Sequence, residues 1–243
     1  MVSKNRLKFI KSLKIKKYRQ KERSFLVEGR KNVLELINSD FEVQCILATN
    51  KFISSYGNTG NNLEIHEVNS DLLAEVGSFQ TNEDCLAVAS MKPSILSELI
   101  ISKPTFVLDG VGDPGNLGTI IRTLDWFGHD TLICSSDTAE FYNPKVINST
   151  MGSFTRVKVY YTALKEYLTN VGLPIYGADL DGVHPRDCDF SVPSLMVMGS
   201  ESHGLSEEVK PLINHFVSIP GSDRAESLNV AMATGILAYQ AYH

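Results

Sequence analysis

A glycine-rich segment at residues 109–118, DGVGDPGNLG, contains the first residues whose types and spacing could support chemistry. Gly110, Gly112 and Gly115 have the G-x-G-x-x-G spacing and stand between an expected strand and an expected helix. This spacing is typical of dinucleotide binding, because glycines let the backbone approach a pyrophosphate closely. An NAD-dependent oxidoreductase is therefore one alternative, although a lone match of this kind is a weak signal.

Arg122, in the helix expected after that segment, is the side chain that the dinucleotide pattern leaves unexplained. It interrupts an apolar pattern over residues 117–124, and we expect it to be half-buried. A half-buried arginine needs an anionic partner, and a nucleic-acid phosphate would serve, because the guanidinium fork matches phosphate oxygens. Asn116, at the start of the same helix, is well suited to cap it.

Two more segments with unusual residues follow expected strands. Residues 199–206, GSESHGLS, place Glu201 at a strand end between glycines that permit close approach of a ligand. This segment misses the G-x-S-x-G of a serine hydrolase, because Ser200 occupies the first position. Residues 219–231, IPGSDRAESLNVA, offer Ser227 as the N-cap of a helix, with the mediocre helix former Asn229 in its first turn.

Alternating strands and helices must position these three segments. Strands are expected at 105–109, 131–135, 156–160, 174–178, 194–199 and 215–219. Helices are expected at 117–127, 144–150, 162–169, 205–214 and 227–241. This alternation predicts a parallel sheet covered on both faces, with ligands bound at the carboxyl ends of its strands.

The N-terminal part of the chain predicts a smaller α/β unit that begins with a basic helix. Strands are expected at 24–29, 43–48, 63–66 and 85–90, after an amphipathic helix within residues 3–17. Residues 1–31 contain twelve Lys and Arg against two Glu, although the whole chain has a net charge of −5. Such a basic segment on an acidic body favours a polyanionic partner, because phosphate neutralisation supplies most sequence-independent affinity.

Composition and spacing exclude several other classes. No apolar run approaches the roughly 18 residues of a membrane span, and no apolar stretch follows the N-terminal basic residues as in a secretory signal. The four cysteines are too widely spaced for a metal site or a redox pair. We therefore expect free thiols, no metal, no membrane contact and a cytoplasmic location.

Taken together, three motifs resemble the SpoU (TrmH-like) family of RNA 2'-O-methyltransferases in the SPOUT superfamily. They are D-P-G-N-L-G-x-x-x-R-T at 113–123, G-S-E-x-x-G-L at 199–205 and I-P-x-x-x-x-x-E-S-L-N-V-A at 219–231. Their order and placement at strand ends agree with the family. Gly221 departs from it, since many relatives have a larger apolar residue there.

The resemblance implies an α/β fold with two domains. Residues 104–243 would form a SpoU methyltransferase domain, a C-terminal α/β knot with a mostly parallel sheet and a SPOUT trefoil knot. Residues 1–92, in which the FLVEG segment at 25–29 resembles the family, would form an L30e-like RNA substrate-binding domain. The family also implies a homodimer whose site is completed across the interface.

The resemblance further implies the chemistry and the residues that perform it. The reaction would move a methyl group from S-adenosylmethionine to a ribose 2'-hydroxyl of structured RNA, rRNA being favoured over tRNA. Arg122 would be the central catalytic residue, either as a base or as a positioning group, helped by Asn116, Glu201, Ser227 and Asn229. Cofactor-binding residues would be Gly199, Gly204, Ile219 and Leu228. RNA-binding residues would be Lys4, Arg6, Lys8, Lys14, Lys17, Arg19, Arg23 and Arg30.

Two alternatives remain open at this point. An NAD-dependent oxidoreductase would use the G-x-G-x-x-G, but it leaves the second and third segments and the basic arm unexplained. A non-catalytic RNA-binding protein on the same fold would be expected to lack Arg122, Glu201 or Asn229, and all three are present.

Overall fold

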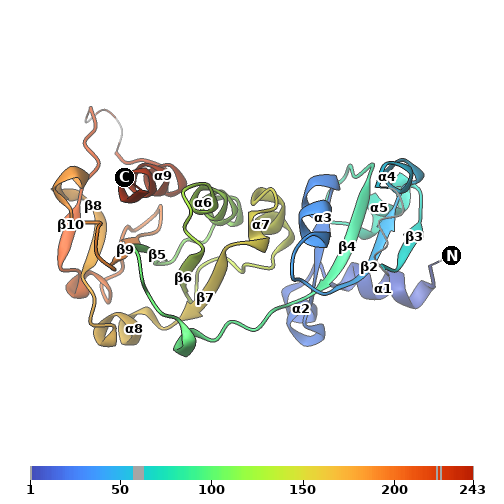
Figure 1. Cartoon of the computed structure of the whole chain (residues 1–243), viewed down its shortest axis with the longest axis horizontal. Helices are drawn as coiled ribbons and strands as arrows, with labels where there is room; N and C mark the ends of the chain where they lie inside the picture. The colour runs from blue at the N-terminus through green and yellow to red at the C-terminus, as the bar shows by residue number, and fades with distance from the viewer. Residues whose placement is uncertain (1, 57–62, 223, 225, 243) are drawn as a thin grey trace. The chain divides into compact units, whose positions relative to one another are not determined.

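The computed structural model describes residues 2–56, 63–222, 224 and 226–242. It contains two compact units. The first unit comprises Met1–Pro93 with Phe141–Thr155, and the second comprises Ser94–Glu140 with Arg156–His243. The segment from Phe141 to Thr155 therefore packs with the N-terminal unit, although it lies between strands of the second sheet in the sequence (Figure 1).

A four-stranded sheet of order β1-β4-β2-β3 organises the first unit. Its strands are β1 (Ser24–Glu28), β2 (Val43–Ala48), β3 (Ile65–Glu67) and β4 (Cys85–Ser90). Strand β4 is antiparallel to both β1 and β2, whereas β3 is parallel to β2. The helices of the unit are α1 (Lys4–Ser12), α2 (Lys16–Glu22), α3 (Arg30–Ile37), α4 (Asn50–Tyr56), α5 (Ser70–Val76) and α7 (Pro144–Ser149).

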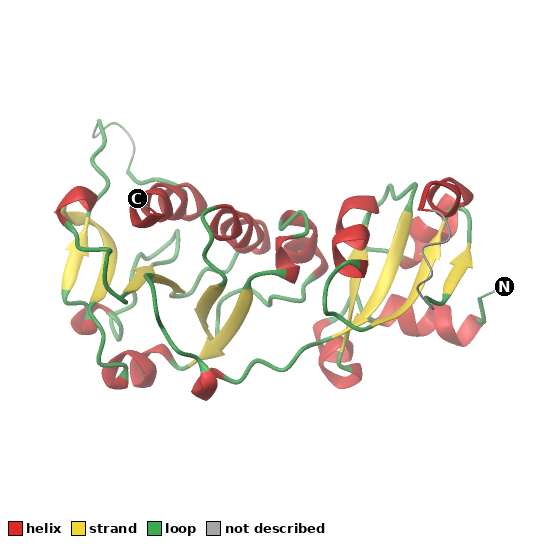
Figure 2. Ribbon diagram, in the orientation of Figure 1, coloured by secondary structure: helices red, strands yellow, loops and turns green. Residues whose placement is uncertain are grey.

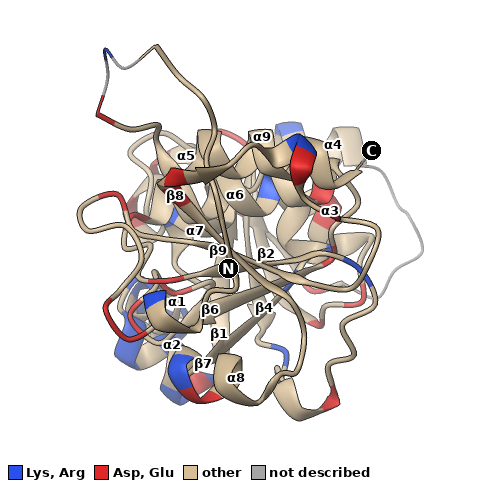
Figure 3. Ribbon diagram, turned by 90° about the vertical axis from the view of Figure 1, so that its left-hand side faces the viewer, with Lys and Arg blue, Asp and Glu red and all other residues tan. Residues whose placement is uncertain are grey.

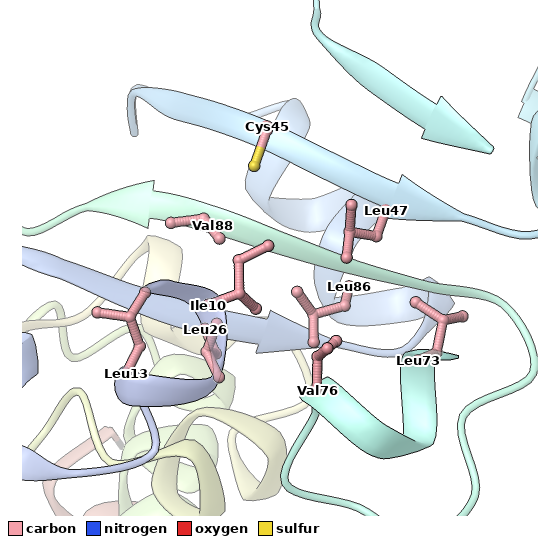
Figure 4. Packing of buried hydrophobic residues seen from close by; sticks show 9 residues of the cluster. All are labelled: Ile10, Leu13, Leu26, Cys45, Leu47, Leu73, Val76, Leu86 and Val88. Carbon is pink, nitrogen blue, oxygen red and sulfur yellow. The ribbon is translucent and has the colours of Figure 1, made fainter. Parts of the chain in front are cut away.

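Both faces of this sheet are covered by apolar side chains. On one face, residues of α1 and α5 pack on alternate strand residues, as Figure 4 shows for Ile10 against Leu26 and Leu86. On the other, Phe25 contacts an aromatic cluster to which Tyr142 and Phe154 contribute. Residues 141–155 thus complete the core of the first unit.

The N-terminal helix expected within residues 3–17 is divided in two. Helix α1 ends at Ser12 and α2 begins at Lys16. Arg19, only 2% exposed, donates from Nη1 to the carbonyl oxygens of Leu13 (2.9 Å) and Lys14 (2.8 Å). These bonds satisfy backbone acceptors that the break leaves free, while Leu13 stays in the core.

The second unit contains a six-stranded sheet of order β10-β8-β9-β5-β6-β7 in which every pairing is parallel. Its strands are β5 (Thr105–Leu108), β6 (Thr131–Ser135), β7 (Lys158–Thr162), β8 (Ile175–Val183), β9 (Leu195–Met198) and β10 (His215–Val217). Helices α6 (Pro114–Trp126) and α9 (Val230–Tyr242) pack together on one face, and α8 (Leu164–Asn170) covers the other (Figures 1 and 2). The mostly parallel sheet and the separate N-terminal α/β unit predicted from the sequence are confirmed, while the knot stays a prediction.

The helix predicted at residues 205–214 does not form. Only the short 3₁₀ turn Lys210–Leu212 is present there. Pro211 cannot donate an α-helical hydrogen bond and its ring clashes with the preceding turn. Leu205 and Val209 are nevertheless buried, so the apolar spacing that suggested a helix instead anchors an irregular segment on the sheet.

The described residues contain neither a membrane-spanning helix nor a disulfide. None of their helices is long and apolar enough to cross a membrane. The four cysteines form no disulfide, and Cys45, Cys85 and Cys134 are buried, as expected of free thiols.

Candidate active site

Helix α6 begins three residues earlier than predicted and is capped by a different residue. The Asp113 carboxylate accepts a hydrogen bond from the backbone N–H of Asn116 (2.9 Å), and Pro114 occupies the first turn. The prediction that Asn116 caps this helix is therefore wrong. Because Asp113 supplies the cap, the side-chain amide of Asn116 is left to contact other segments.

Asn116 joins the three segments that the sequence singled out. Its Nδ2 donates to Oε1 of Glu201, in the loop after β9. Its Oδ1 accepts a hydrogen bond from Nδ2 of Asn229 (3.1 Å), at the start of α9. A chain of polar side chains thus runs from Glu201 through Asn116 to Asn229, and residues far apart in the sequence meet at the carboxyl edge of the sheet.

Asn229 also begins α9, a role that the sequence had suggested for Ser227. The Oδ1 atom of Asn229 accepts from the backbone N–H groups of Ala231 (2.9 Å) and Met232 (3.4 Å). The helix accordingly begins at Val230, and Ser227 lies in the exposed segment before it. One asparagine therefore both caps α9 and ties it to α6.

A cavity of about 430 Å³ opens at the carboxyl ends of β8, β9 and β10. All four residues expected to bind the cofactor line it, as do two of the expected catalytic residues. These six are Gly199, Gly204, Ile219, Leu228, Glu201 and Ser227. Gly110, Gly112 and Gly115 do not line this cavity, so its position gives the dinucleotide alternative no support.

Gly199 and Gly204 shape the wall of this cavity. Ser200 and Gly204 exchange two backbone hydrogen bonds of 2.9 Å, which folds the loop back on itself. A Cβ atom on Gly199 would lie 2.2 Å from the carbonyl carbon of Gly204. Gly204 has φ +66°, a conformation that favours glycine. This loop therefore needs both glycines to adopt its shape.

The lining of the cavity suits a small organic ligand. Met198, Leu205, Val217, Ile219 and Leu228 provide apolar surface, and backbone groups of the loops provide hydrogen-bonding atoms. Such a mixture of apolar walls and a few polar groups is typical of pockets that hold small organic ligands.

The cavity is also lined by three residues that were not predicted from the sequence, Asp179, Leu180 and Lys210. The Asp179 carboxylate lies 3.3 Å from Nζ of Lys210. The strand predicted to end at residue 178 continues to Val183, which places Asp179 beside the cavity. In the sequence, Asp179 and Asp181 come directly after the apolar residues of this strand. This pair of carboxylates at a strand end could have indicated a site residue.

Arg122 is placed differently from the expectation. It is exposed on α6, and the prediction that it is half-buried is wrong. Thr119 and Trp126, one turn to either side, are exposed as well, whereas Leu117, Ile120, Ile121 and Leu124 are buried on the opposite side of the helix. Within the described part of the chain, the Arg122 guanidinium makes no hydrogen bond or ion pair, and it does not line the cavity.

The basic residues of the first unit fall into two groups. Figure 3 shows Lys and Arg along α1 and α2. Lys4, Lys8, Lys14, Lys17 and Arg23 are exposed. Of the exposed group, Lys14 donates from Nζ to the carbonyl oxygen of Glu75 (3.2 Å).

The remaining three of the expected RNA-binding residues are held by contacts within the unit. Arg6 makes a bidentate ion pair with Glu64 (2.5 and 2.6 Å), and Arg30 donates to Ser55 (2.7 Å). Arg19 is buried, so its guanidinium faces the backbone between α1 and α2 instead of solvent.

Comparison with known proteins identifies the class to which this α/β fold and its strand-end cavity belong. A sequence model of the SpoU rRNA Methylase family matches residues 103–239, and one of an MRM3-like substrate binding domain matches residues 4–87. The chain is 31% identical over 234 residues to the 23S rRNA guanosine 2'-O-methyltransferase RlmP of Bacillus subtilis, covering 94% of this chain and 92% of RlmP.

Solved structures agree over the full length. The SpoU methyltransferase AviRb of Streptomyces viridochromogenes, solved in complex with AdoMet, superposes with a TM-score of 0.86 at 27% identity, covering 99% of this chain and 97% of AviRb. A Porphyromonas gingivalis protein assigned to the TrmH family of RNA methyltransferases gives a TM-score of 0.88 at 34% identity, covering 99% and 98% of the two chains.

The chain therefore belongs to the SpoU rRNA methylase family. It is an S-adenosylmethionine-dependent RNA methyltransferase.

Proposed function

We propose that this enzyme methylates the 2'-hydroxyl of a ribose in ribosomal RNA. The observation that carries the proposal is the chain Glu201–Asn116–Asn229, which ties the first family motif to the second and third, whose residues line the cavity. Two relatives, RlmP and an enzyme from Streptomyces viridochromogenes that is 34% identical over 186 residues, are named as 23S rRNA 2'-O-methyltransferases. These names favour rRNA over tRNA as the substrate.

The cofactor would occupy the cavity at the ends of β8, β9 and β10. S-adenosylmethionine, when bound, supplies an electrophilic methyl group on a sulfonium. Gly199, Gly204, Ile219 and Leu228 would hold it, mainly through backbone groups, and the apolar lining would receive its adenosyl part. A ribose hydroxyl is a weak nucleophile, so in-line placement must provide much of the acceleration, which can reach roughly 7–11 kcal/mol.

Arg122 would contact the target nucleotide. Its guanidinium is exposed and has no protein partner among the described residues, so it is free to bind a phosphate. Arginine stays protonated in proteins, which favours a role in positioning the nucleotide. Ser227, at the cavity, would orient the ribose, while Glu201, Asn116 and Asn229 hold the loops in place.

The domain predicted at residues 1–92 would bind the RNA backbone, and the domain at 104–243 would perform the transfer. The five exposed basic residues named above would contact phosphates, which position an RNA without reading its sequence. Arg6, Arg19 and Arg30 would contribute mainly by stabilising the unit that carries them.

A homodimer would complete the site. Met232, Ile236 and Tyr239 follow one another at helical spacing on α9 and are 62%, 38% and 50% exposed. Trp126, at the end of α6, which packs against α9, is 83% exposed. An apolar surface of this kind is typical of a subunit interface.

The direct test is methyl transfer from tritiated S-adenosylmethionine to purified rRNA and tRNA, with mapping of 2'-O-methyl positions in cells with and without the gene. We expect label in rRNA and one or a few positions that lose methylation. Label on a base would contradict the ribose assignment, and label only in tRNA would contradict the substrate.

A further inference from the structure

Asp109, directly after β5, is a buried carboxylate that none of the roles above uses. It is 7% exposed. Its Oδ2 accepts a hydrogen bond of 2.7 Å from the backbone N–H of Ser206, which lies 97 residues further along the chain. This hydrogen bond ties the backbone at Ser206 to the end of β5.

The backbone around Asp109 is fixed on both sides. Its own N–H donates to the carbonyl oxygen of Met198 (2.9 Å), and the N–H of Gly110 donates to Oγ of Ser135 (2.9 Å). The Ser135 hydroxyl is in turn hydrogen-bonded to that of Thr138 (2.9 Å). The ends of β5, β6 and β9 are thereby linked, and the Asp109 carboxylate has a defined direction.

Ser206 directly follows the residues that form one wall of the cofactor cavity. Gly204 and Leu205 line the cavity, and Gly204 is paired with Ser200 through the backbone. Gly199 approaches Gly204 so closely that no Cβ would fit between them. A shift of the backbone at residues 204–206 would therefore change the shape of the cavity.

We propose that Asp109 is a positioning residue for cofactor binding, because its carboxylate holds the backbone at Gly204–Ser206 in the conformation that receives S-adenosylmethionine. The inference rests on the proposed place of the cofactor in this cavity. Asp109 would not contact the RNA, so its replacement should change cofactor binding and leave RNA binding unchanged.

The test compares three variants of the full chain by calorimetric titration with S-adenosylmethionine and by steady-state kinetics. Asp109→Ala removes the acceptor, whereas Asp109→Asn keeps an oxygen that can accept from Ser206. Thr105→Val is the matched control, since Thr105 is a buried polar residue at the opposite end of the same strand, 3% exposed, with its hydroxyl donating to Lys103.

We expect Asp109→Ala to raise the Kd and the KM for S-adenosylmethionine at least tenfold, with kcat at saturating cofactor and the KM for RNA within threefold of wild type. Asp109→Asn should restore the Kd to within about threefold, and Thr105→Val should leave it unchanged. If Asp109→Ala does not fold, Asp109→Ser, whose side chain is too short to reach Ser206, carries the same expectation.

An unchanged Kd in the Ala or Ser variant would overturn the inference, as would an equal loss in Thr105→Val. A loss in Asp109→Asn as large as in Asp109→Ala would also overturn it, because charge would then matter instead of the hydrogen bond. A wild-type protein with no affinity for S-adenosylmethionine would instead refute the proposed place of the cofactor, so the two failures are distinguishable.

Discussion

The side-chain amide of Asn116 donates to Glu201 and accepts from Asn229, which lie 85 and 113 residues further along the chain. Both contacts use one planar group, so the two loops are held at a fixed distance from the first turn of α6. This arrangement links the cofactor cavity to the helix that carries Arg122.

Replacement of Asn116 should therefore slow methyl transfer. Loss of one member of a polar network costs on the order of 1–3 kcal/mol, so we expect Asn116→Ala to reduce the single-turnover rate by about 10- to 100-fold. Asn116→Asp should be at least as slow, because it places a carboxylate against that of Glu201. Asn170→Ala is the control, since the hydrogen bond that Asn170 makes to Glu166 among the described residues lies within α8. A wild-type single-turnover rate in Asn116→Asp would contradict a role of the Glu201–Asn116–Asn229 hydrogen bonds in methyl transfer.

Arg122→Ala should abolish methyl transfer while the Kd for S-adenosylmethionine stays within threefold. The reason is that Arg122 lies outside the cavity lining. Arg122→Lys should recover little activity, because an ammonium lacks the bidentate fork of a guanidinium. Arg156→Ala is a control on a surface arginine, since Arg156 pairs with Asp125. Full turnover with weakened cofactor binding in Arg122→Ala would exclude a role at the target nucleotide.

A Cβ atom at Gly199 should destroy the cavity. Gly199→Ala would bring that atom 2.2 Å from the Gly204 carbonyl carbon, so the loop must shift. Overpacking of this kind costs roughly 1–3 kcal/mol in stability, and we expect cofactor affinity to fall more than tenfold. Gly112→Ala meets open space and should leave both quantities unchanged. Titration calorimetry measures the cofactor affinity of the two variants, and thermal unfolding measures their stability.

Arg23 should show opposite effects on stability and on RNA binding. It caps α2 with φ 50° and ψ 36°, a left-handed conformation in which glycine is favoured. Arg23→Gly should raise the stability by about 1 kcal/mol, whereas Arg23→Ala keeps the strain and should not. Both variants should weaken RNA binding and reduce the salt slope by about one. Unchanged RNA affinity in both would remove Arg23 from the RNA-binding surface.

His129 should make stability depend on pH. Burial lowers the pKa of this imidazole, whose Nδ1 lies 3.1 Å from the carbonyl oxygen of Pro104 and whose Nε2 is buried without a partner among the described residues. The unfolded chain then binds a proton more readily than the folded protein. Its contribution to stability is present above pH 6.5, the ordinary histidine value, and is lost as the pH falls through and below that value.

The measurement is the unfolding free energy of wild type and His129→Gln between pH 7.5 and pH 5. We expect a smaller fall on acidification in the variant, although it is less stable at neutral pH. His203→Gln, at an exposed position, serves as the comparison. Parallel pH profiles for wild type and His129→Gln would disprove the role of His129.

Much of the fold was predictable because it depends on local periodicity. Each of the ten strands in the described residues overlaps a predicted range, and the strand–helix alternation correctly predicted a parallel sheet. The failure at residues 205–214 shows the limit of that reasoning. Leu205 and Val209 have helical spacing, but Pro211 and the bond from Ser206 to Asp109 give the backbone another conformation.

The sequence by itself determined the residue types at three strand ends and, through their resemblance to a family, the kind of reaction. Only the tertiary structure decided which side chains meet. Capping depends on the positions of backbone N–H groups, so Asp113 and Asn229, instead of Asn116 and Ser227, begin the two helices. Burial depends on how a helix rotates against its neighbours, so Arg122 faces solvent while Arg19 is buried. These properties arise from contacts between segments far apart in the chain, which local sequence patterns do not specify.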